Sequence, residues 1–176
     1  MAVNQQESSD TNHVYDVVII GMGAAGVGVS VALTDAGIEN IMGLERYTVG
    51  ASFARWPAEM RFITPSFATN SVGMLDINSI AIGASPAFGL QVEHPTGIQY
   101  ASHLAAVVDA FELPVRQKID VKQIVPVDGL FRIETATESF TAKQGIWAAV
   151  GVPARAMSKR ARKAAPRAIF RASVTS

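Results

Sequence analysis

The feature of the sequence that most constrains the fold is the hexapeptide GMGAAG at positions 21–26, which directly follows the almost wholly apolar run Val14–Ile20. The run is rich in β-branched residues, as is typical of a strand in a parallel sheet that is covered on both faces. Small and apolar residues continue at helical length over 24–36, and Gly37 stands where a left-handed C-cap would end the helix. With a second short strand at 40–45, this order predicts a right-handed βαβ unit.

The three glycines of the hexapeptide fit the spacing G-x-G-x-x-G, which is typical of dinucleotide binding. Gly21 would permit the sharp turn out of the strand, Gly23 would let a pyrophosphate approach the backbone, and Gly26 would let the helix lie close to the sheet. The free amide groups of Ala24 and Ala25, at the positive end of the helix dipole, would then hold the phosphates. Such an anion site needs no basic side chain.

An acidic residue stands where a ribose would be bound in such a unit. Glu45 ends the second predicted strand, 24 residues after Gly21. A carboxylate at this place accepts hydrogen bonds from a ribose diol and repels a 2′-phosphate, so the pattern favours FAD or NAD over NADP. The alternative is a structural glycine-rich turn in which Glu45 is a solvated charge at the end of a strand.

The sequence after this unit predicts a long loop and a second helix. Residues 46–88 keep no period and mix Gly, Pro, Ser and aromatic residues, which indicates a functional loop. Thr96 and Gln99 have the spacing of a capping box, which predicts the start of a helix over 97–111. The apolar stripe expected on this helix consists of Ile98, Ala101, Leu104, Ala105, Val108 and Phe111.

Short apolar runs toward residue 150 predict the remaining strands. Three of them lie at 121–127, 130–135 and 139–142, and the Asp128-Gly129 pair between the first two is typical of a hairpin turn. A fourth run at 146–150 predicts a final apolar strand.

Three stretches of the chain resemble FAD-dependent oxidoreductases of the pyridine nucleotide-disulfide oxidoreductase and flavin-containing monooxygenase type. They are GMGAAG, the run LERYTVGAS at 44–52, and WP followed by RFITPSF at 61–67. The resemblance covers about residues 14–150 and implies an α/β, Rossmann-like FAD/NAD(P)-binding domain with a parallel sheet and a small antiparallel β insertion. It also implies FAD as the cofactor and NAD(P)H as the electron donor.

The same resemblance implies roles for individual residues. Glu45 would bind the adenosine ribose, Arg46 would lie near the adenine, and the backbone of Val121 would touch the adenine. Ser52 would belong to a turn that passes the flavin side of the cofactor. Trp56 would lie near the isoalloxazine or on its substrate face.

The departures from this family are equally informative. A second G-x-G-x-x-G for NADPH and the monooxygenase pattern F-x-G-x-x-x-H do not occur in the sequence, and a redox-active disulfide is excluded because the chain has no cysteine. Three scattered histidines without nearby carboxylates at ligand spacing predict no metal site. No catalytic acid, base or nucleophile can be named, so we expect a domain that is not catalytically complete alone.

The formal net charge of zero hides an uneven distribution along the chain. Residues up to 150 hold 8 basic and 15 acidic side chains, whereas the remainder holds 7 basic and no acidic ones. We expect a disordered lead at 1–13, an incomplete FAD-binding domain at 14–151 and a disordered, basic, Ala- and Arg-rich tail at 152–176. The composition of the tail suggests translation in a shifted reading frame, which the coding DNA would test.

The sequence leaves three functions open. The first is the FAD-binding portion of a flavoprotein oxidoreductase, the second is a non-catalytic NAD- or ADP-binding module, and the third is binding of an anionic polymer through KRARK at 159–163. Nucleic acid is not favoured, because no aromatic residues are interleaved with this run. The lack of a signal-peptide pattern predicts a cytoplasmic protein without a membrane segment. A sheet ending near Ile146 would expose an apolar face, so we expect a homo-oligomer or a partner that covers it.

Overall fold

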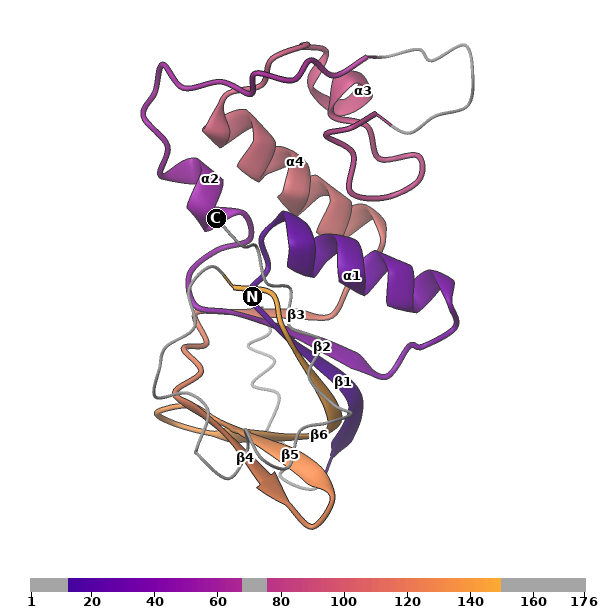
Figure 1. Cartoon of the computed structure of the whole chain (residues 1–176), viewed down its shortest axis with the longest axis vertical. Coiled ribbons are helices and arrows are strands. Elements are labelled where there is room, and N and C mark those ends of the chain that lie inside the picture. The colour runs from indigo at the N-terminus through magenta and orange to yellow at the C-terminus, as the bar shows by residue number, and fades with distance from the viewer. Residues whose placement is uncertain (1–12, 68–75, 150–176) are drawn as a thin grey trace, which may run out of the picture.

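The structure is a computed structural model that describes residues 13–67 and 76–149 of the 176-residue chain. Strands and helices follow one another as the βαβ pattern predicts, with a loop-rich layer after the second strand (Figure 1). The elements in chain order are β1 (Val14–Ile20), α1 (Ala24–Asp35), β2 (Ile41–Glu45), α2 (Ala51–Ala54), α3 (Pro86–Leu90), α4 (Gly97–Ala110), β3 (Val115–Gln117), β4 (Gln123–Val127), β5 (Leu130–Glu134) and β6 (Ser139–Trp147).

The strands form one mixed sheet in the order β3-β2-β1-β6-β5-β4. β1 pairs in parallel with β2 and β6, and β2 pairs in parallel with β3. β5 pairs antiparallel with β4 and with β6, so the antiparallel strands continue the parallel sheet through β6. The predicted α/β, Rossmann-like fold with a parallel sheet and a small antiparallel region is therefore confirmed.

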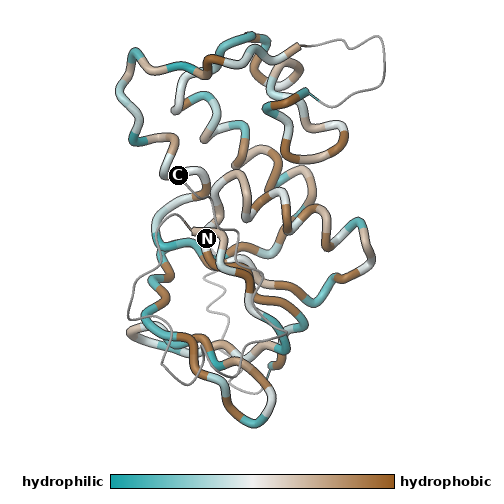
Figure 2. Tube along the Cα trace, in the orientation of Figure 1, coloured by the Kyte–Doolittle hydropathy of each residue, from teal (hydrophilic) through white to brown (hydrophobic). Residues whose placement is uncertain are grey.

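Both faces of β1 are buried, which explains why its sequence is apolar without alternation. Val17 and Ile19 pack with residues of α1 and α4 on one face, whereas Val18 and Ile20 pack with residues of the antiparallel strands on the other. All four side chains are 5% exposed or less. Figure 1 shows the helices on one side of the parallel strands and β4 and β5 on the other, and Figure 2 shows hydrophobic residues along the strands between them.

The strands predicted at 139–142 and 146–150 are one strand, β6, and the prediction of two was wrong. Residues 139–142 pair with β5, while residues 141–147 pair with β1, so β6 has a partner along its whole length. Lys143 and Gln144, which lie between the two predicted runs, are exposed, and Lys143 Nζ lies 2.6 Å from Asp16 Oδ1 of β1. The end of the predicted range, Val150, lies outside the described residues. β3 has three residues and was not predicted.

The second helix begins as predicted, and two residues of its predicted apolar stripe, Ala101 and Leu104, are buried. The Thr96–Gln99 capping box is formed in both directions, with N···O distances of 3.2 and 2.9 Å. Ile98 belongs to the predicted apolar stripe, yet it is 61% exposed. Tyr100 and His103 are buried in its place, because the loop layer before the helix packs on that side. The side chains of α4 that are buried belong to Tyr100, Ala101, His103, Leu104 and Val107.

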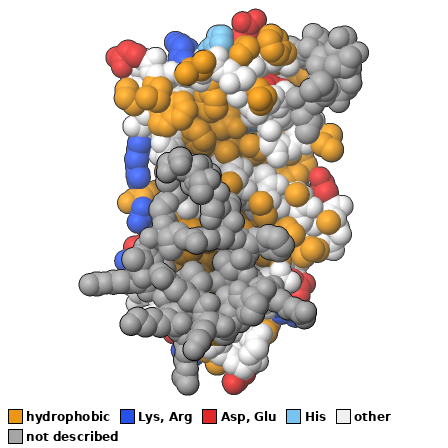
Figure 3. All heavy atoms as spheres, viewed as in Figure 1, with side chains coloured by type: hydrophobic (Ala, Val, Ile, Leu, Met, Phe, Trp, Pro, Cys, Tyr) orange, Lys and Arg blue, Asp and Glu red, His pale blue; other side chains and the backbone are white. Residues whose placement is uncertain are grey.

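Among the described residues, the large apolar side chains that are exposed lie on the loops that follow β2 and on the helices α3 and α4, and none lies in a strand. Hydrophobic atoms gather over the end of the molecule that holds α2, α3 and α4 (Figure 3). The exposed large side chains in this region are Met60, Ile63, Phe67, Ile77, Ile82, Phe88 and Ile98. The expectation of a partner or second copy that covers an apolar face stays a prediction.

Two of the predicted segments fall where the structure gives no description. The predicted lead at 1–13, except His13, and the tail at 152–176 lie outside the described residues. Among the helices of the described ranges, none combines the length and the apolarity that a membrane span requires.

The capping box offers a test of how α4 is stabilised. Thr96→Ala removes the side-chain acceptor for the Gln99 amide, and we expect the free energy of unfolding to fall by about 1 kcal/mol. Urea unfolding followed by circular dichroism measures this change. Ser102→Ala on the exposed face of the same helix is the matched control, and an equal loss there would contradict the assigned role of Thr96.

Candidate functional site

The turn between β1 and α1 contains two glycines, Gly21 and Gly26, whose surroundings leave no room for a side chain. Gly21 has a φ of +95°, and a Cβ atom placed on it would lie 2.8 Å from the Cα of Ala149. A Cβ on Gly26 would lie 1.9 Å from the carbonyl oxygen of Gly21. Both positions therefore exclude larger residues for internal reasons, as the tight turn and the close helix approach of the motif predict.

Gly23 differs from Gly21 and Gly26, because nothing in the described structure crowds the space that its Cβ would occupy. Its φ is −83°, and the nearest heavy atom to a Cβ placed there is Ser52 Oγ, at 3.8 Å. The residue is the N-cap of α1, a helix whose N-terminus has no side-chain cap and no acidic residue in its first turn. Ala24 is half-buried and Ala25 is exposed. This helix end is thus open to an anion that binds backbone amide groups.

Glu45 connects this turn to the end of β2. Its carboxylate is buried, with the residue 9% exposed, and Oε2 accepts a hydrogen bond of 2.8 Å from the Met22 amide. Oε1 accepts a second bond of 2.8 Å from the Tyr47 amide. The alternative in which Glu45 is a solvated charge is therefore wrong. A carboxylate offers about four acceptor positions, so about two remain for a ligand.

Arg46 follows Glu45 and is exposed at the edge of this region. Its guanidinium carbon lies 4.8 Å from the centre of the Tyr47 ring, and that of Arg55 lies 3.9 Å from the same ring. Tyr47 therefore lies against two cations, which orders the surface beside Glu45. The sequence pattern did not indicate this stacking, because the three side chains meet only through the turn after β2.

Ser52 is brought to the glycine turn by α2. The Gly50 amide donates to the Met22 carbonyl at 3.0 Å, which ties the start of α2 to the turn after β1. Ser52 is exposed, and its hydroxyl oxygen is the atom nearest to the open side of Gly23. Ser52, which was expected on the flavin side, therefore lies beside Gly23, which was expected to border the pyrophosphate.

Trp56 lies in a cluster of aromatic rings between α2 and α4. Its ring centre is 5.3 Å from that of Phe53 and 5.2 Å from that of Phe62. Tyr100 of α4 completes the cluster, at 4.8 Å from Phe53 and 4.5 Å from Phe62. Through this cluster, Trp56 holds the loop residues that follow α2 against α4. No spacing in the sequence indicated that these four rings meet.

The side chain of Val121 is buried against the face of the sheet opposite α1 and α4, where it packs with Val18 and Leu44. The segment before it runs beside the end of β2, because the Ile119 amide donates to the Glu45 carbonyl at 2.8 Å. The backbone around Val121 is thus brought near the predicted adenosine side.

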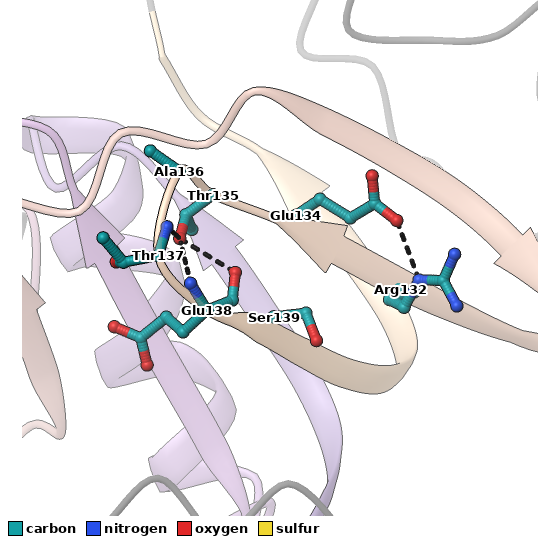
Figure 4. Close-up of a pocket in the computed structure, with 7 residues that line it drawn as sticks. All are labelled: Arg132, Glu134, Thr135, Ala136, Thr137, Glu138 and Ser139. Atoms are coloured by element: carbon teal, nitrogen blue, oxygen red, sulfur yellow. Dashed lines mark hydrogen bonds and ion pairs between the residues drawn. The ribbon is translucent and has the colours of Figure 1, made fainter.

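A separate hollow lies at the turn between β5 and β6 (Figure 4). Arg132 Nε pairs with Glu134 at 2.8 Å, and Thr135 Oγ1 donates to the Glu138 carbonyl at 2.8 Å. The Glu138 carboxylate pairs with Arg116 of β3 at 2.7 Å, so these charged side chains are already paired within the described chain. Across residues 13–67 and 76–149, no group of three or more His, Asp or Glu side chains could hold a metal ion.

The geometry at the carboxyl ends of β1 and β2 defines the class of the protein. An uncapped helix N-terminus, an open glycine and a buried carboxylate lie together where ligands bind in open parallel sheets. The chain is an α/β domain of the Rossmann-like class. A family model described as "Pyridine nucleotide-disulphide oxidoreductase" matches residues 18–152, and the chain belongs to that family.

Solved structures of flavin enzymes and a disulfide reductase have a similar fold. Bacillithiol disulfide reductase from Staphylococcus aureus is 18% identical with a TM-score of 0.60, and 77% of this chain covers 38% of that one. A flavin-containing monooxygenase from Stenotrophomonas maltophilia is 19% identical with a TM-score of 0.58, at 76% and 37% coverage. OTEMO in complex with FAD and NADP is 20% identical with a TM-score of 0.56, at 76% and 25% coverage. This chain therefore spans less than two fifths of each.

The two backbone bonds to Glu45 predict a stability effect that needs no ligand. Glu45→Gln turns an amide donor toward one of two backbone N–H groups, and we expect the free energy of unfolding to fall by about 1–3 kcal/mol. Urea unfolding of the ligand-free protein measures it. Glu39→Gln, at an exposed site just before β2, should change stability by less than about 0.5 kcal/mol. Equal effects of the two substitutions would show that the carboxylate is not a structural clamp.

Proposed function

We propose that this chain is the FAD-binding portion of a flavoprotein oxidoreductase of the monooxygenase-like type. The observation that carries the proposal is Gly23, the one glycine of the motif whose missing Cβ is not explained by contacts within the described chain. A position kept open beside an uncapped helix N-terminus suits a pyrophosphate that approaches the backbone. The family membership and the likeness to solved flavoenzymes support FAD as the ligand.

The residues present fit the adenosine and pyrophosphate half of FAD. The amide groups of Ala24 and Ala25 would donate to the pyrophosphate, favoured by the helix dipole. Glu45 would accept from the ribose diol with the carboxylate positions that Met22 and Tyr47 leave free. These groups are already held in place by the chain, so little ordering is needed on binding.

Other residues would contact the two ends of the ligand. Arg46 and the backbone of Val121 would lie near the adenine, while Ser52 and Trp56 would face the flavin side. FAD, when bound, supplies the redox chemistry of such enzymes. The protein's share is to bind and orient it, and we assign no catalytic acid, base or nucleophile.

Electron donation by NAD(P)H would require parts that this sequence does not contain. The chain spans 25–38% of the length of the flavin enzymes and the disulfide reductase compared above, and a second G-x-G-x-x-G does not occur in its 176 residues. We therefore propose that the chain binds flavin without completing a catalytic cycle alone. The family match at 18–152 supports a domain at 14–151 with the basic tail outside it. A cytoplasmic location is part of the same proposal.

A second candidate is a non-catalytic module that binds NAD or ADP. The open Gly23 and the buried Glu45 favour any ligand with an adenosine ribose and a diphosphate, so they do not select FAD by themselves. The visible spectrum separates the two. Flavin absorbance that stays with the protein through gel filtration supports the first candidate, and a colourless protein that binds NAD but not added FAD would overturn it.

Binding of an anionic polymer through residues 152–176 is a third, weaker candidate that rests on seven basic residues there. It predicts salt-sensitive binding of DNA that is lost when residues 152–176 are deleted. Binding that survives the deletion would exclude the tail as its cause.

Gly23 gives the sharpest test of the nucleotide site. Gly23→Ala places a methyl group on the open side of the turn, and we expect FAD affinity to fall at least about tenfold, which is about 1.4 kcal/mol. The ligand-free protein should lose less than about 1 kcal/mol of stability, because the residue has an ordinary φ and no near contact. Titration of flavin fluorescence and urea unfolding measure the two effects.

A second glycine serves as the matched control for this test. Gly145 in β6 also has nothing within 4 Å of an added Cβ. Gly145→Ala should leave FAD affinity unchanged. A similar loss of affinity in both variants would argue against a ligand that passes over Gly23.

A further inference from the structure

His103 lies on the side of α4 that carries residues 76–90. The residue is 6% exposed, and its Nε2 is the one fully buried side-chain nitrogen or oxygen in the described ranges that has no hydrogen-bond partner. The imidazole donates to the backbone of Ala84, and a Cβ placed on Gly89 of α3 would lie 3.5 Å from its Nδ1. The ring is thus enclosed by the segment 76–90 and offers that segment no second hydrogen bond.

The same segment is held to its surroundings by a polar network that includes one charge. The Asn78 side-chain amide donates to Ser66 Oγ at 2.9 Å, and the Tyr100 hydroxyl donates to the Asn78 carbonyl at 2.8 Å. The Asp76 carboxylate accepts from the Asn78 amide at 3.0 Å and from the Ser85 hydroxyl at 2.7 Å. These polar groups of the segment therefore all have hydrogen-bond partners while the imidazole of His103 is neutral.

Among the described residues, few charged or titratable groups face His103. Asp76 comes from the segment, Tyr100 comes from α4, and the residues of α3 carry no charged side chain. Burial, followed by the charge of Asp76, raises the pKa of Tyr100 to about 12, so its hydroxyl remains neutral. Burial also lowers the pKa of His103 below its ordinary value, while the Ala84 hydrogen bond and Asp76 only partly oppose this effect.

We propose that protonation of His103 loosens the attachment of residues 76–90 to α4, so that this segment opens in mildly acidic solution. A protonated imidazole would carry a second N–H donor at Nε2 with no acceptor and a charge in a buried site. Opening would bring both groups into water. Opening would also expose Ala87 and enlarge the apolar surface that Ile77 and Phe88 already present.

The direction of the effect follows from proton binding in the two forms. The closed form has the lower pKa and binds fewer protons, so its stability relative to the open form rises with pH. The stabilisation is complete above the ordinary pKa of about 6.5 and is lost as the pH falls below it, down to the lowered value. Each unit of difference between the two pKa values changes the opening equilibrium by up to about tenfold.

Single cysteines report this opening directly, because the chain has no cysteine of its own. Ala87→Cys places a thiol at a buried site of α3, and Ile82→Cys places one at a site that is 78% exposed in the same segment. A methanethiosulfonate reagent labels each full-length variant at pH 7.5 and 5.5. The rate at position 87 divided by the rate at position 82 cancels the pH dependence of thiolate formation, because the thiolate is the form that reacts. We expect this ratio to rise several-fold at pH 5.5.

Histidine variants of the labelled proteins decide the cause. In His103→Gln and His103→Leu the ratio should not change with pH, whereas His94→Gln, at an exposed histidine, should keep the rise. Circular dichroism at both pH values checks that the opening is local. A ratio that does not rise in the parent overturns the proposal, as does an equal rise in both His103 variants. FAD binding plays no part in this readout.

Discussion

Two backbone hydrogen bonds to one buried carboxylate hold together the end of the sheet that carries the candidate site. Through Glu45, the amide of Met22 in the first turn and the amide of Tyr47 after β2 are fixed relative to each other. The tie between the Gly50 amide and the Met22 carbonyl then sets the start of α2 against the same turn. The candidate site is thus organised by the chain itself, because bonds to a charged group are stronger than those between neutral groups.

The glycines of the motif divide into two kinds when their surroundings are compared. Gly21 and Gly26 have no room for a side chain because other backbone atoms occupy that space. Gly23 has room, because the nearest heavy atom in the described chain to a Cβ placed on it is Ser52 Oγ at 3.8 Å. The glycines of one sequence pattern therefore differ in what their surroundings require, and only contacts in three dimensions separate them.

Features that depend on local sequence could be predicted, whereas features that depend on distant pairing could not. The βαβ unit and the capping box at Thr96 follow from residues close in sequence, and both are confirmed. The continuity of β6 through Lys143 depends on partners in two other strands, which no local pattern reveals. The burial of His103 likewise results from a loop that returns over α4, so its sequence neighbours gave no sign of it.

The pairing of the first strand with the last has a consequence for how this domain is made. Residues 14–20 align with residues 141–147, and Ala149 is the residue nearest to a Cβ placed on Gly21. During synthesis from the N-terminus, β6 is made last of the described elements. The edge of β1 that pairs with β6 therefore stays uncovered until almost the whole described chain has been made. Until then β1 presents an apolar, unpaired edge, which favours aggregation or the need for a chaperone. A change that slows the arrival of β6 would lower the yield of folded protein without touching any ligand contact.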